Sequence, residues 1–481
     1  MNHEAHKGKI VRSQWASKMG FILATAGAAV GLGNLWKFPY LMGRNGGFPF
    51  LVAYLIFVLA LGLPVMITEM SIGRLTQKNP VNAYHAINRK TTFIGVMGVL
   101  SAFIILSYYS VIGGWILKYI ASYATTFSAP ADFSAYVAQP VEPVVWHLIF
   151  MALTCFICYK GTKGIEKASS VMMPALFILL IVLIVRSVTL PGAMSGLRFI
   201  FTPADSNFSF DSIVAAMGQV FYSLSLGMGI TVTYGSYLRR SENIPRSCAT
   251  VAGLDTMAAV FAGIAIFPAV FAFNLEPAQG PGLIFGTLPN VFGNMPAGAV
   301  FAILFFVLMF FAALTSAIAL LECVVSYTMD DLHWSRVKSV FLLGVLIFLL
   351  GVPSSLSFGP LGDMLIFNYT FFDFMGVLTD NFLMPLGGIA MCVYVGWIWG
   401  PQRLLAHIES DGVSFKLKKA WLWCIRIITP VLIVIVMAMG IVGIARVVGG
   451  LRPACRHLEK AAVLLESGAA AFFANCKRQE L

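Results

Sequence analysis

Long runs of apolar residues without charge recur along the whole chain, and they constrain its fold more than any other feature. A run of about 20 such residues is what an α-helix needs to cross the hydrocarbon core of a bilayer. Hydrophobic residues make up 59% of the 481 residues and charged residues 11%, so little of the chain is left for a soluble domain. We therefore expect an all-α polytopic membrane protein, which excludes a soluble enzyme with a single anchor.

The apolar runs predict eleven transmembrane helices. Their approximate ranges are 15–40, 48–72, 93–123, 144–159, 168–188, 210–238, 249–271, 297–328, a ninth ending near 351, 377–399 and 421–447. The first range carries no cleavage signal and is expected to be retained. We divide the chain into a cytoplasmic N-terminal segment (1–14), a first repeat (15–188), a second repeat (189–400), an eleventh helix (401–447) and a C-terminal tail (448–481).

The distribution of Lys and Arg predicts the topology. Twenty of them lie in the loops on one side of the predicted bundle, whereas Arg186 and Arg198 lie in loops on the other side. Because basic loops stay in the cytoplasm, we place the N-terminus there, in a multi-pass protein of the cell inner (plasma) membrane surrounded by lipid. This asymmetry accounts for the net charge of +11 without a nucleic-acid partner. Eleven helices put the basic tail outside, which conflicts with the rule that basic segments stay in the cytoplasm. The apolar stretch 461–474 is either a short twelfth span or a surface amphipathic helix, so the conflict stays open.

Glycine interrupts the first predicted helix in the middle of the membrane. Gly27, Gly31 and Gly33 fall within seven residues, and the polar Asn34 follows them. Each glycine disfavours a helix by about 1 kcal/mol relative to alanine, and unpaired backbone groups in hydrocarbon cost more. Breaks of this kind bind anions at the N-terminus of a half-helix and cations at unwound carbonyls. The alternative is a glycine-lined contact between intact helices.

A second interruption, the glycine- and serine-rich stretch 223–229, lies five helices later. Two breaks at corresponding places indicate two repeats of five helices. Since five is an odd number, the repeats have opposite orientations in the membrane and can rock about a site at its midplane. This arrangement is typical of a secondary transporter.

Side-chain oxygens accompany the two breaks. Thr315 and Ser316 lie within the apolar eighth helix, where such hydroxyls often bond only to their own backbone. Together with carbonyls of the broken helix, they could supply the five or six oxygens that Na⁺ prefers without a buried carboxylate. Asn34, Ser223 and Asp255 could form a second oxygen cluster.

These stretches together resemble the neurotransmitter:sodium symporter family, in particular its eleven-helix bacterial amino-acid transporters, over roughly residues 10–447. The resemblance implies a five-plus-five inverted repeat with helices 1 and 6 broken, a fold known for binding at midplane breaks. The motifs that carry it, in family order, are Gly31-Leu32-Gly33-Asn34-Leu35-Trp36-Lys37-Phe38-Pro39, Asn45-Gly46-Gly47, Glu69 with Gly73-Arg74, 219–229, and Leu314-Thr315-Ser316.

The resemblance implies one substrate pocket and two sodium sites. In the pocket, Tyr109 matches the family tyrosine that binds the substrate carboxylate. The first sodium site would be formed by the Ala29 carbonyl, Asn34, Ser223 and Asp255. The second would be formed by the carbonyls of Gly27, Val30 and Ala312 with Thr315 and Ser316. The pocket would be lined by Ala29, Gly31, Leu32, Gly33, Ile105, Tyr109, Tyr222, Ser223, Ser225, Met228, Ser316 and Leu320.

The resemblance also implies a gate on each side of the pocket. The outer gate would pair Lys37 with Asp380. Lys37 replaces the arginine of most relatives, which keeps the charge but loses the bidentate fork. The cytoplasmic gate would be formed by Arg12 and Asp330, with support from Trp15 and Tyr237.

One departure from the family pattern concerns charge. Asp255 stands where many relatives have Asn, and Ala259 stands where chloride-dependent relatives have a serine. A carboxylate at Asp255 would supply internally the negative charge that a bound chloride supplies in those relatives. We therefore expect transport without chloride.

The expected function is sodium-coupled uptake of a neutral, hydrophobic or aromatic L-amino acid by alternating access. The alternative is a channel or receptor-like sensor on the same fold, although the sequence has no ring of charge and no repeated filter motif. An intramembrane enzyme would need paired acids, a nucleophile with its base, or metal ligands. Glu69 and Glu322 lack an obvious partner in the sequence, and we expect no enzymatic activity.

Overall fold

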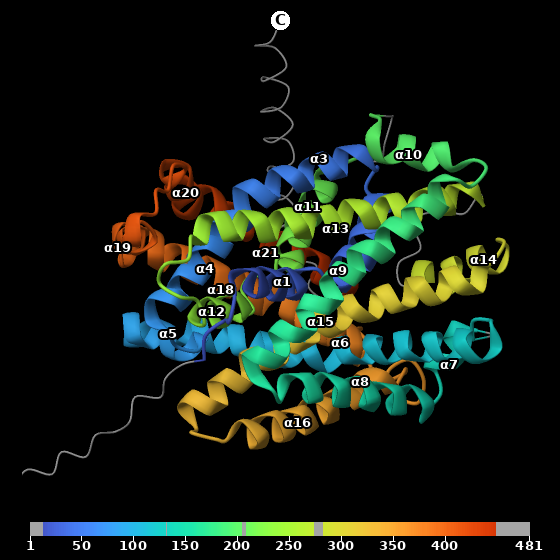
Figure 1. Cartoon of the computed structure of the whole chain (residues 1–481), viewed down its shortest axis with the longest axis horizontal. Helices are drawn as coiled ribbons and strands as arrows, with labels where there is room; N and C mark the ends of the chain where they lie inside the picture. The colour runs from blue at the N-terminus through green and yellow to red at the C-terminus, as the bar shows by residue number, and fades with distance from the viewer. Residues whose placement is uncertain (1–12, 131, 204–207, 274–281, 449–481) are drawn as a thin grey trace, which may run out of the picture.

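The computed structural model describes residues 13–130, 132–203, 208–273 and 282–448. Arg12, the predicted partner of Asp330, and the tail stretch 461–474 lie outside the described residues. The described part is helical, and it contains no β-strand. Its long helices run side by side across the molecule, as expected for an all-α membrane protein (Figure 1).

Most of the predicted spans appear as continuous helices. In the described part, eight helices are long and apolar enough to cross a membrane. They are Phe48–Thr76 (α3 to α4), Arg89–Thr126 (mostly α6), Gly161–Val188 (α9), Ile244–Ala272 (α13), Gly298–Asp331 (α15), Arg336–Leu356 (α16), Phe371–Ile398 (α17 to η6) and Lys418–Ala445 (α20, η8 and most of α21).

The first predicted span is a bent pair of helices. Helix α1 (Lys18–Ala29) and the segment Gly33–Arg44 (η1 and α2) form it, with an angle of 50° at the break. Two further segments lie where the fourth and sixth spans are predicted. They are the 17-residue α8 (Glu142–Cys158) and the broken pair α11 (Phe210–Ser223) and α12 (Ile230–Ser236). Length and hydropathy alone support eight or nine spans in the described residues, so the count of eleven remains a prediction.

Short helices cap the two ends of the bundle. The helices α5 and α19 lie at one end, whereas α7, α10 and α14 lie at the other (Figure 1). Their bounds are Pro80–Ile87 (α5), Phe133–Val137 (α7), Ala193–Phe201 (α10), Leu288–Gly293 (α14) and Pro401–Ile408 (α19).

The start of the fifth predicted span differs most from the structure. The fifth span was expected to begin near residue 168 after a basic loop, but α9 already begins at Gly161. Lys163 and Lys167 therefore lie on the first turns of a helix, with exposed side chains. A helix satisfies its own backbone hydrogen bonds, so it can continue beyond the hydrocarbon core into the headgroup region.

The first break lies where the glycines predict it. Helix α1 ends at Ala29, and Val30 adopts an extended conformation with ψ of 93° before η1 begins at Gly33. A Cβ atom at Gly27 would lie 3.1 Å from Cβ of Thr315, so glycine lets α1 approach α15 closely. The broken helix is thereby held against the part of α15 that carries the two predicted hydroxyl ligands.

The second break requires left-handed backbone. Gly227 and Gly229 both have φ of 72°, and Ser225 has φ of 54°. A glycine adopts such angles without the steric cost that other residues meet. Glu69 of α4 (Leu63–Thr76) accepts a hydrogen bond from the Gly227 N–H at 3.1 Å and another from the Thr231 hydroxyl, so a buried carboxylate fixes the break to the start of α12.

Candidate functional site

A small cavity of about 30 Å³ lies between the two breaks. It is lined by eleven of the twelve residues predicted for the substrate pocket, together with Ala28 and Ile230, which the sequence analysis did not identify. Ser223 is the predicted residue that does not line it. This volume holds no more than a few water molecules, so an organic ligand could enter only if the walls moved apart.

One end of the cavity is polar. The N–H of Leu32 donates a hydrogen bond to the hydroxyl of Tyr109 at 3.2 Å. Ser225 and Ser316 donate hydrogen bonds to the carbonyl of Ala28, at 3.0 Å and 3.2 Å. The start of a half-helix and a tyrosine hydroxyl therefore meet at this end, which suits an anionic group.

The same end has no room for a side chain on Gly31. A Cβ atom there would lie 2.5 Å from the Ser316 Oγ and 3.0 Å from the Tyr109 hydroxyl. Both distances are shorter than ordinary contacts with Cβ atoms. The position therefore requires glycine, because Ser316 and the Tyr109 hydroxyl already occupy the space that a side chain would need.

The other end of the cavity is apolar. Its walls are the side chains of Ile105, Met228, Ile230 and Leu320, with Tyr222 closing one side. All of these except Tyr222 are buried. Methionine is flexible and polarizable, so a wall that contains Met228 can adapt to different apolar groups.

Asn34, Ser223 and Asp255 converge in a buried cluster beside the cavity, as predicted. Asn34 Nδ2 donates to Asp255 Oδ1 at 2.8 Å and to Ser223 Oγ at 3.0 Å, and Ser223 Oγ donates to Asp255 Oδ2 at 2.8 Å. Tyr54, which the sequence analysis missed, donates its hydroxyl to Asp255 Oδ2 at 3.3 Å. The side chains that contact this fully buried carboxylate are neutral, so the cluster suits a bound cation.

The residues of the second predicted sodium site also lie together. The Ser316 hydroxyl faces the carbonyls of Gly27 and Ala28, at 3.4 Å and 3.2 Å. The Thr315 hydroxyl donates to its own helix, to the carbonyls of Phe311 at 2.9 Å and Ala312 at 3.1 Å. The Ser316 hydroxyl is therefore next to the predicted Gly27 carbonyl, whereas the Thr315 hydroxyl makes the contact with its own backbone that the alternative interpretation expects.

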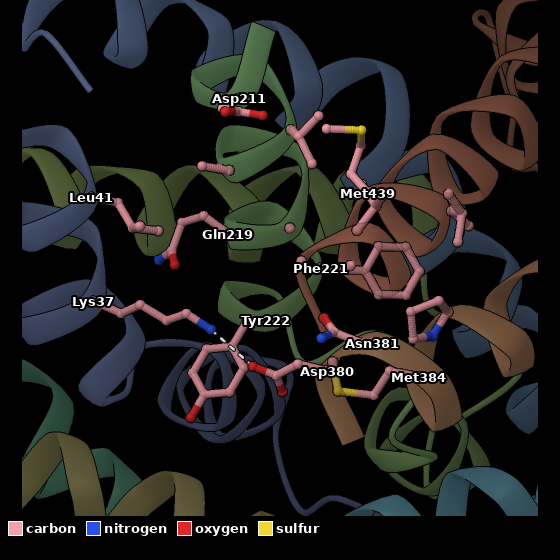
Figure 2. Close-up of a pocket in the computed structure, with 18 of the residues that line it drawn as sticks. Lys37, Leu41, Asp211, Gln219, Phe221, Tyr222, Asp380, Asn381, Met384 and Met439 are labelled. Carbon is pink, nitrogen blue, oxygen red and sulfur yellow. Dashed lines mark hydrogen bonds and ion pairs between the residues drawn. The ribbon is translucent and has the colours of Figure 1, made fainter. Parts of the chain in front are cut away.

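The two residues predicted for the outer gate form a direct ion pair. Lys37 Nζ lies 3.0 Å from Asp380 Oδ2 and 4.3 Å from the centre of the Tyr222 ring. Figure 2 shows the pair joined beside that ring, at the edge of a cavity of about 360 Å³ whose far wall includes Met439. A second cavity of about 480 Å³ lies against the same pair, lined among others by Trp36. The pair and the ring separate this open space from the small cavity.

At the other end, Trp15 and Tyr237 pack together as predicted. Their ring centres are 5.9 Å apart, and Trp15 Nε1 donates to the carbonyl of Tyr234 at 3.1 Å. Asp330 accepts a hydrogen bond from Asn79 Nδ2 at 3.0 Å. The pairing of Asp330 with Arg12 remains a prediction.

A partly buried ion pair lies at this end, and the sequence did not predict it. Glu322 pairs with Arg336 and accepts a hydrogen bond from the Tyr237 hydroxyl at 2.8 Å. The expectation that Glu322 lacks a partner was therefore wrong. The chain reverses between α15 and α16 and brings together residues 14 positions apart, a contact that helical spacing could not predict.

The sequence profile of the sodium:neurotransmitter symporter family matches residues 12–132 and 133–448. The chain belongs to this family. An uncharacterized sodium-dependent transporter of Bacillus subtilis, YhdH, is 41% identical over 442 residues, which cover 90% of this chain and 98% of that protein. A sodium- and chloride-dependent taurine transporter of Bos taurus is 27% identical and covers 88% of this chain and 77% of that protein.

The fold matches that of a solved structure. The crystal structure of MhsT in complex with L-phenylalanine superposes with a TM-score of 0.83 at 43% identity, covering 89% of this chain and all of that chain. The symporter fold predicted from the two glycine breaks is confirmed. The protein is a sodium-dependent membrane transporter and not an enzyme.

Proposed function

We propose that the protein takes up a neutral, hydrophobic or aromatic L-amino acid together with two Na⁺ ions by alternating access. The observation that carries the proposal is the cavity between the breaks. Its polar end presents the Leu32 N–H and the Tyr109 hydroxyl, and its other end presents aliphatic side chains and Met228. An amino acid with an apolar side chain matches both ends, because its carboxylate suits the polar end and its side chain suits the apolar end.

The carboxylate would lie beside Gly31 and contribute to the first sodium site. In monoamine transporters of the family an Asp at this position meets the amine of the substrate, whereas Gly31 has no carboxylate to offer here. The substrate must then bring its own negative charge to the ion held by Asn34, Ser223 and Asp255. This explains the coupling, because the ion and the amino acid each complete the site of the other.

The ion gradients supply enough free energy for concentrative uptake. Two Na⁺ ions that move through 100 mV release about 4.6 kcal/mol. A tenfold Na⁺ gradient adds about 2.8 kcal/mol for two ions. The sum supports roughly 10⁵-fold accumulation of a neutral substrate.

The N-terminus is proposed to lie in the cytoplasm, which places the Lys37–Asp380 pair on the outer side of the pocket. In the proposed cycle this pair closes one end of the path, and Glu322, Arg336 and Tyr237 close the other. Alternating access requires the two to open in turn. A channel would instead need both to be open at the same time.

Competition binding tests the substrate class. Labelled L-phenylalanine should bind the purified protein in Na⁺ and lose most of its binding in K⁺. L-Tyrosine should displace it, whereas tyramine, which has the same ring and amine but no carboxylate, should not. Equal displacement by tyrosine and tyramine would rule out recognition through the carboxylate. Counterflow of labelled amino acid in proteoliposomes separates a carrier from the channel alternative, which shows none.

A further inference from the structure

The last described span has the least buried surface of the long helices. It consists of α20 (Lys418–Trp423), η8 (Cys424–Ile428) and α21 (Thr429–Val448). In its most apolar stretch of 18 residues, only 17% is buried within the protein, whereas the next least buried of the eight spans reaches 33%. Most of its surface therefore faces lipid. A charged residue, Arg426, is nevertheless located in this span.

One edge of the Arg426 guanidinium is fixed by the neighbouring segment η6 (Tyr394–Ile398). Arg426 Nε donates to the carbonyl of Gly396 at 3.0 Å, and Trp397 Nε1 donates back to the carbonyl of Arg426 at 3.0 Å. The guanidinium carbon lies 5.9 Å from the Trp397 ring centre. Within the described residues, the two terminal nitrogens of Arg426 have no partner. They remain as a preorganised pair of donors.

The depth of Arg426 suits the boundary between headgroups and hydrocarbon. The span of 28 residues is about 42 Å long, which exceeds a hydrocarbon core of about 30 Å by about 6 Å at each end. Arg426 lies eight residues after Lys418, about 12 Å along the helix. It is thus about 6 Å inside the boundary, a distance that a long arginine side chain can bridge.

Exposed aromatic and basic residues surround it on the same face. The side chains of Trp397 and Trp423 are 64% and 63% exposed, as in the aromatic belt of a membrane interface. Lys419 and Trp423, four residues apart, lie on one side of α20, and Arg426 follows three residues later in η8. Lys419 is also exposed.

We propose that this face binds the phosphate of an anionic phospholipid. The two free donors of Arg426 would hold the phosphate in the bidentate geometry that guanidinium groups favour. Lys419 adds a second positive charge toward the headgroup, and the rings of Trp397 and Trp423 flank the upper acyl chains. The site is independent of the proposed transport substrate, because it lies on the lipid-facing side of the bundle.

Native mass spectrometry of the full-length protein in detergent tests this site. Phosphatidylglycerol and phosphatidylcholine with the same acyl chains serve as probes, and the readout is the affinity for the first bound lipid. Arg426→Gln should weaken phosphatidylglycerol binding by about fivefold or more, the effect of one charge at a membrane surface. Arg246→Gln is the matched control, because it removes the same charge from an exposed position at the start of α13. It should leave the affinity unchanged.

Three other results would contradict the lipid site. An equal loss in the Arg426 and Arg246 variants, or an equal loss of phosphatidylcholine binding, would overturn it. Displacement of the lipid by millimolar inorganic phosphate would assign the site to free phosphate and not to lipid. If Arg426→Gln does not fold, Arg426→Lys takes its place. The affinity for phosphatidylglycerol should fall although the charge is kept, because lysine cannot bind bidentately, and an unchanged affinity would reject the site.

Discussion

Asp255 places a full negative charge beside the proposed first sodium site. Its carboxylate contacts one amide and two hydroxyls, and it is completely buried. A buried carboxylate without a positive partner is unfavourable, and a bound Na⁺ would remove that penalty. Ala259, one turn later on α13, is buried and has no hydroxyl to offer an anion. These two residues make the charge balance of the site testable.

Replacing chloride with gluconate at fixed Na⁺ should leave uptake by the unmodified protein intact, because Asp255 supplies the negative charge. Asp255→Asn should weaken the apparent Na⁺ affinity about tenfold or more, which corresponds to about 1.4 kcal/mol. Chloride should restore part of the lost affinity in this variant. Strong chloride dependence of the unmodified protein would contradict the role given to Asp255.

Met228→Phe should change the size preference of the pocket. The side chain forms part of the apolar wall and is buried, so a rigid ring there reduces the space for the substrate. Overpacking of this kind costs about 1–3 kcal/mol, so uptake of tryptophan should fall roughly 5- to 150-fold more than uptake of alanine. Uptake rates for a series of amino acids measure this. The same loss for all sizes would mean that Met228 is not in the pocket.

At the scale of residues, the contacts that the family resemblance implies were predicted from the sequence. The contacts that form where the chain folds back on itself were missed. Lys37 and Asp380 were paired across 343 positions because the family pattern joins them. Tyr54 was missed because a tyrosine in an apolar helix has the same appearance whether it packs or donates a hydrogen bond. Glu322 and Arg336 were missed because their contact depends on how α16 folds back on α15.

The contact between α1 and α15 is an element-level prediction of a sodium site. Thr315→Ala combined with Ser316→Ala removes two hydroxyl ligands, so the apparent Na⁺ affinity should fall by about an order of magnitude or more. Ser326→Ala on the same helix is the control, because among the described residues this hydroxyl bonds only to the carbonyl of Cys323, at 2.8 Å. Sodium titrations of amino-acid binding compare the variants. Unchanged titrations would assign Thr315 and Ser316 to helix packing.

The break between α11 and α12 should depend on Gly227. An alanine there would combine φ of 72° with a Cβ atom 2.8 Å from the carbonyl oxygen of Met384. The backbone term alone is about 1–2 kcal/mol, so Gly227→Ala should lower the thermal unfolding midpoint. Gly253→Ala on α13 is the control, since its Cβ atom would meet no atom within 4 Å. Equal midpoints for both variants would show that the left-handed turn is not required.

Both breaks were predictable because glycines and hydroxyl residues stand out in an apolar helix. Their positions, after Ala29 and after Ser223, agree with the sequence to within a few residues. The start of α9 was not predictable in the same way. Hydropathy marks where a helix leaves the hydrocarbon core, whereas the helix itself ends where its backbone hydrogen bonds end.

At the scale of the whole molecule, the structure combines a small central cavity with ion pairs on both sides of it. The fold was predictable because two breaks five helices apart imply inverted halves. The conformation was not, since the free-energy difference between inward- and outward-open states is not encoded in any local pattern. Symport requires the two five-helix repeats to move about the cavity while Na⁺ and the amino acid are both bound.

Uptake of labelled L-phenylalanine into proteoliposomes tests this central claim most directly. With an inward Na⁺ gradient and a negative interior, the lumen should transiently accumulate phenylalanine well above the external concentration. Replacing external Na⁺ with choline, or collapsing the gradient with a sodium ionophore, should abolish the accumulation. Uptake that proceeds equally in choline, or that never exceeds equilibrium in Na⁺, would contradict sodium-coupled amino-acid symport.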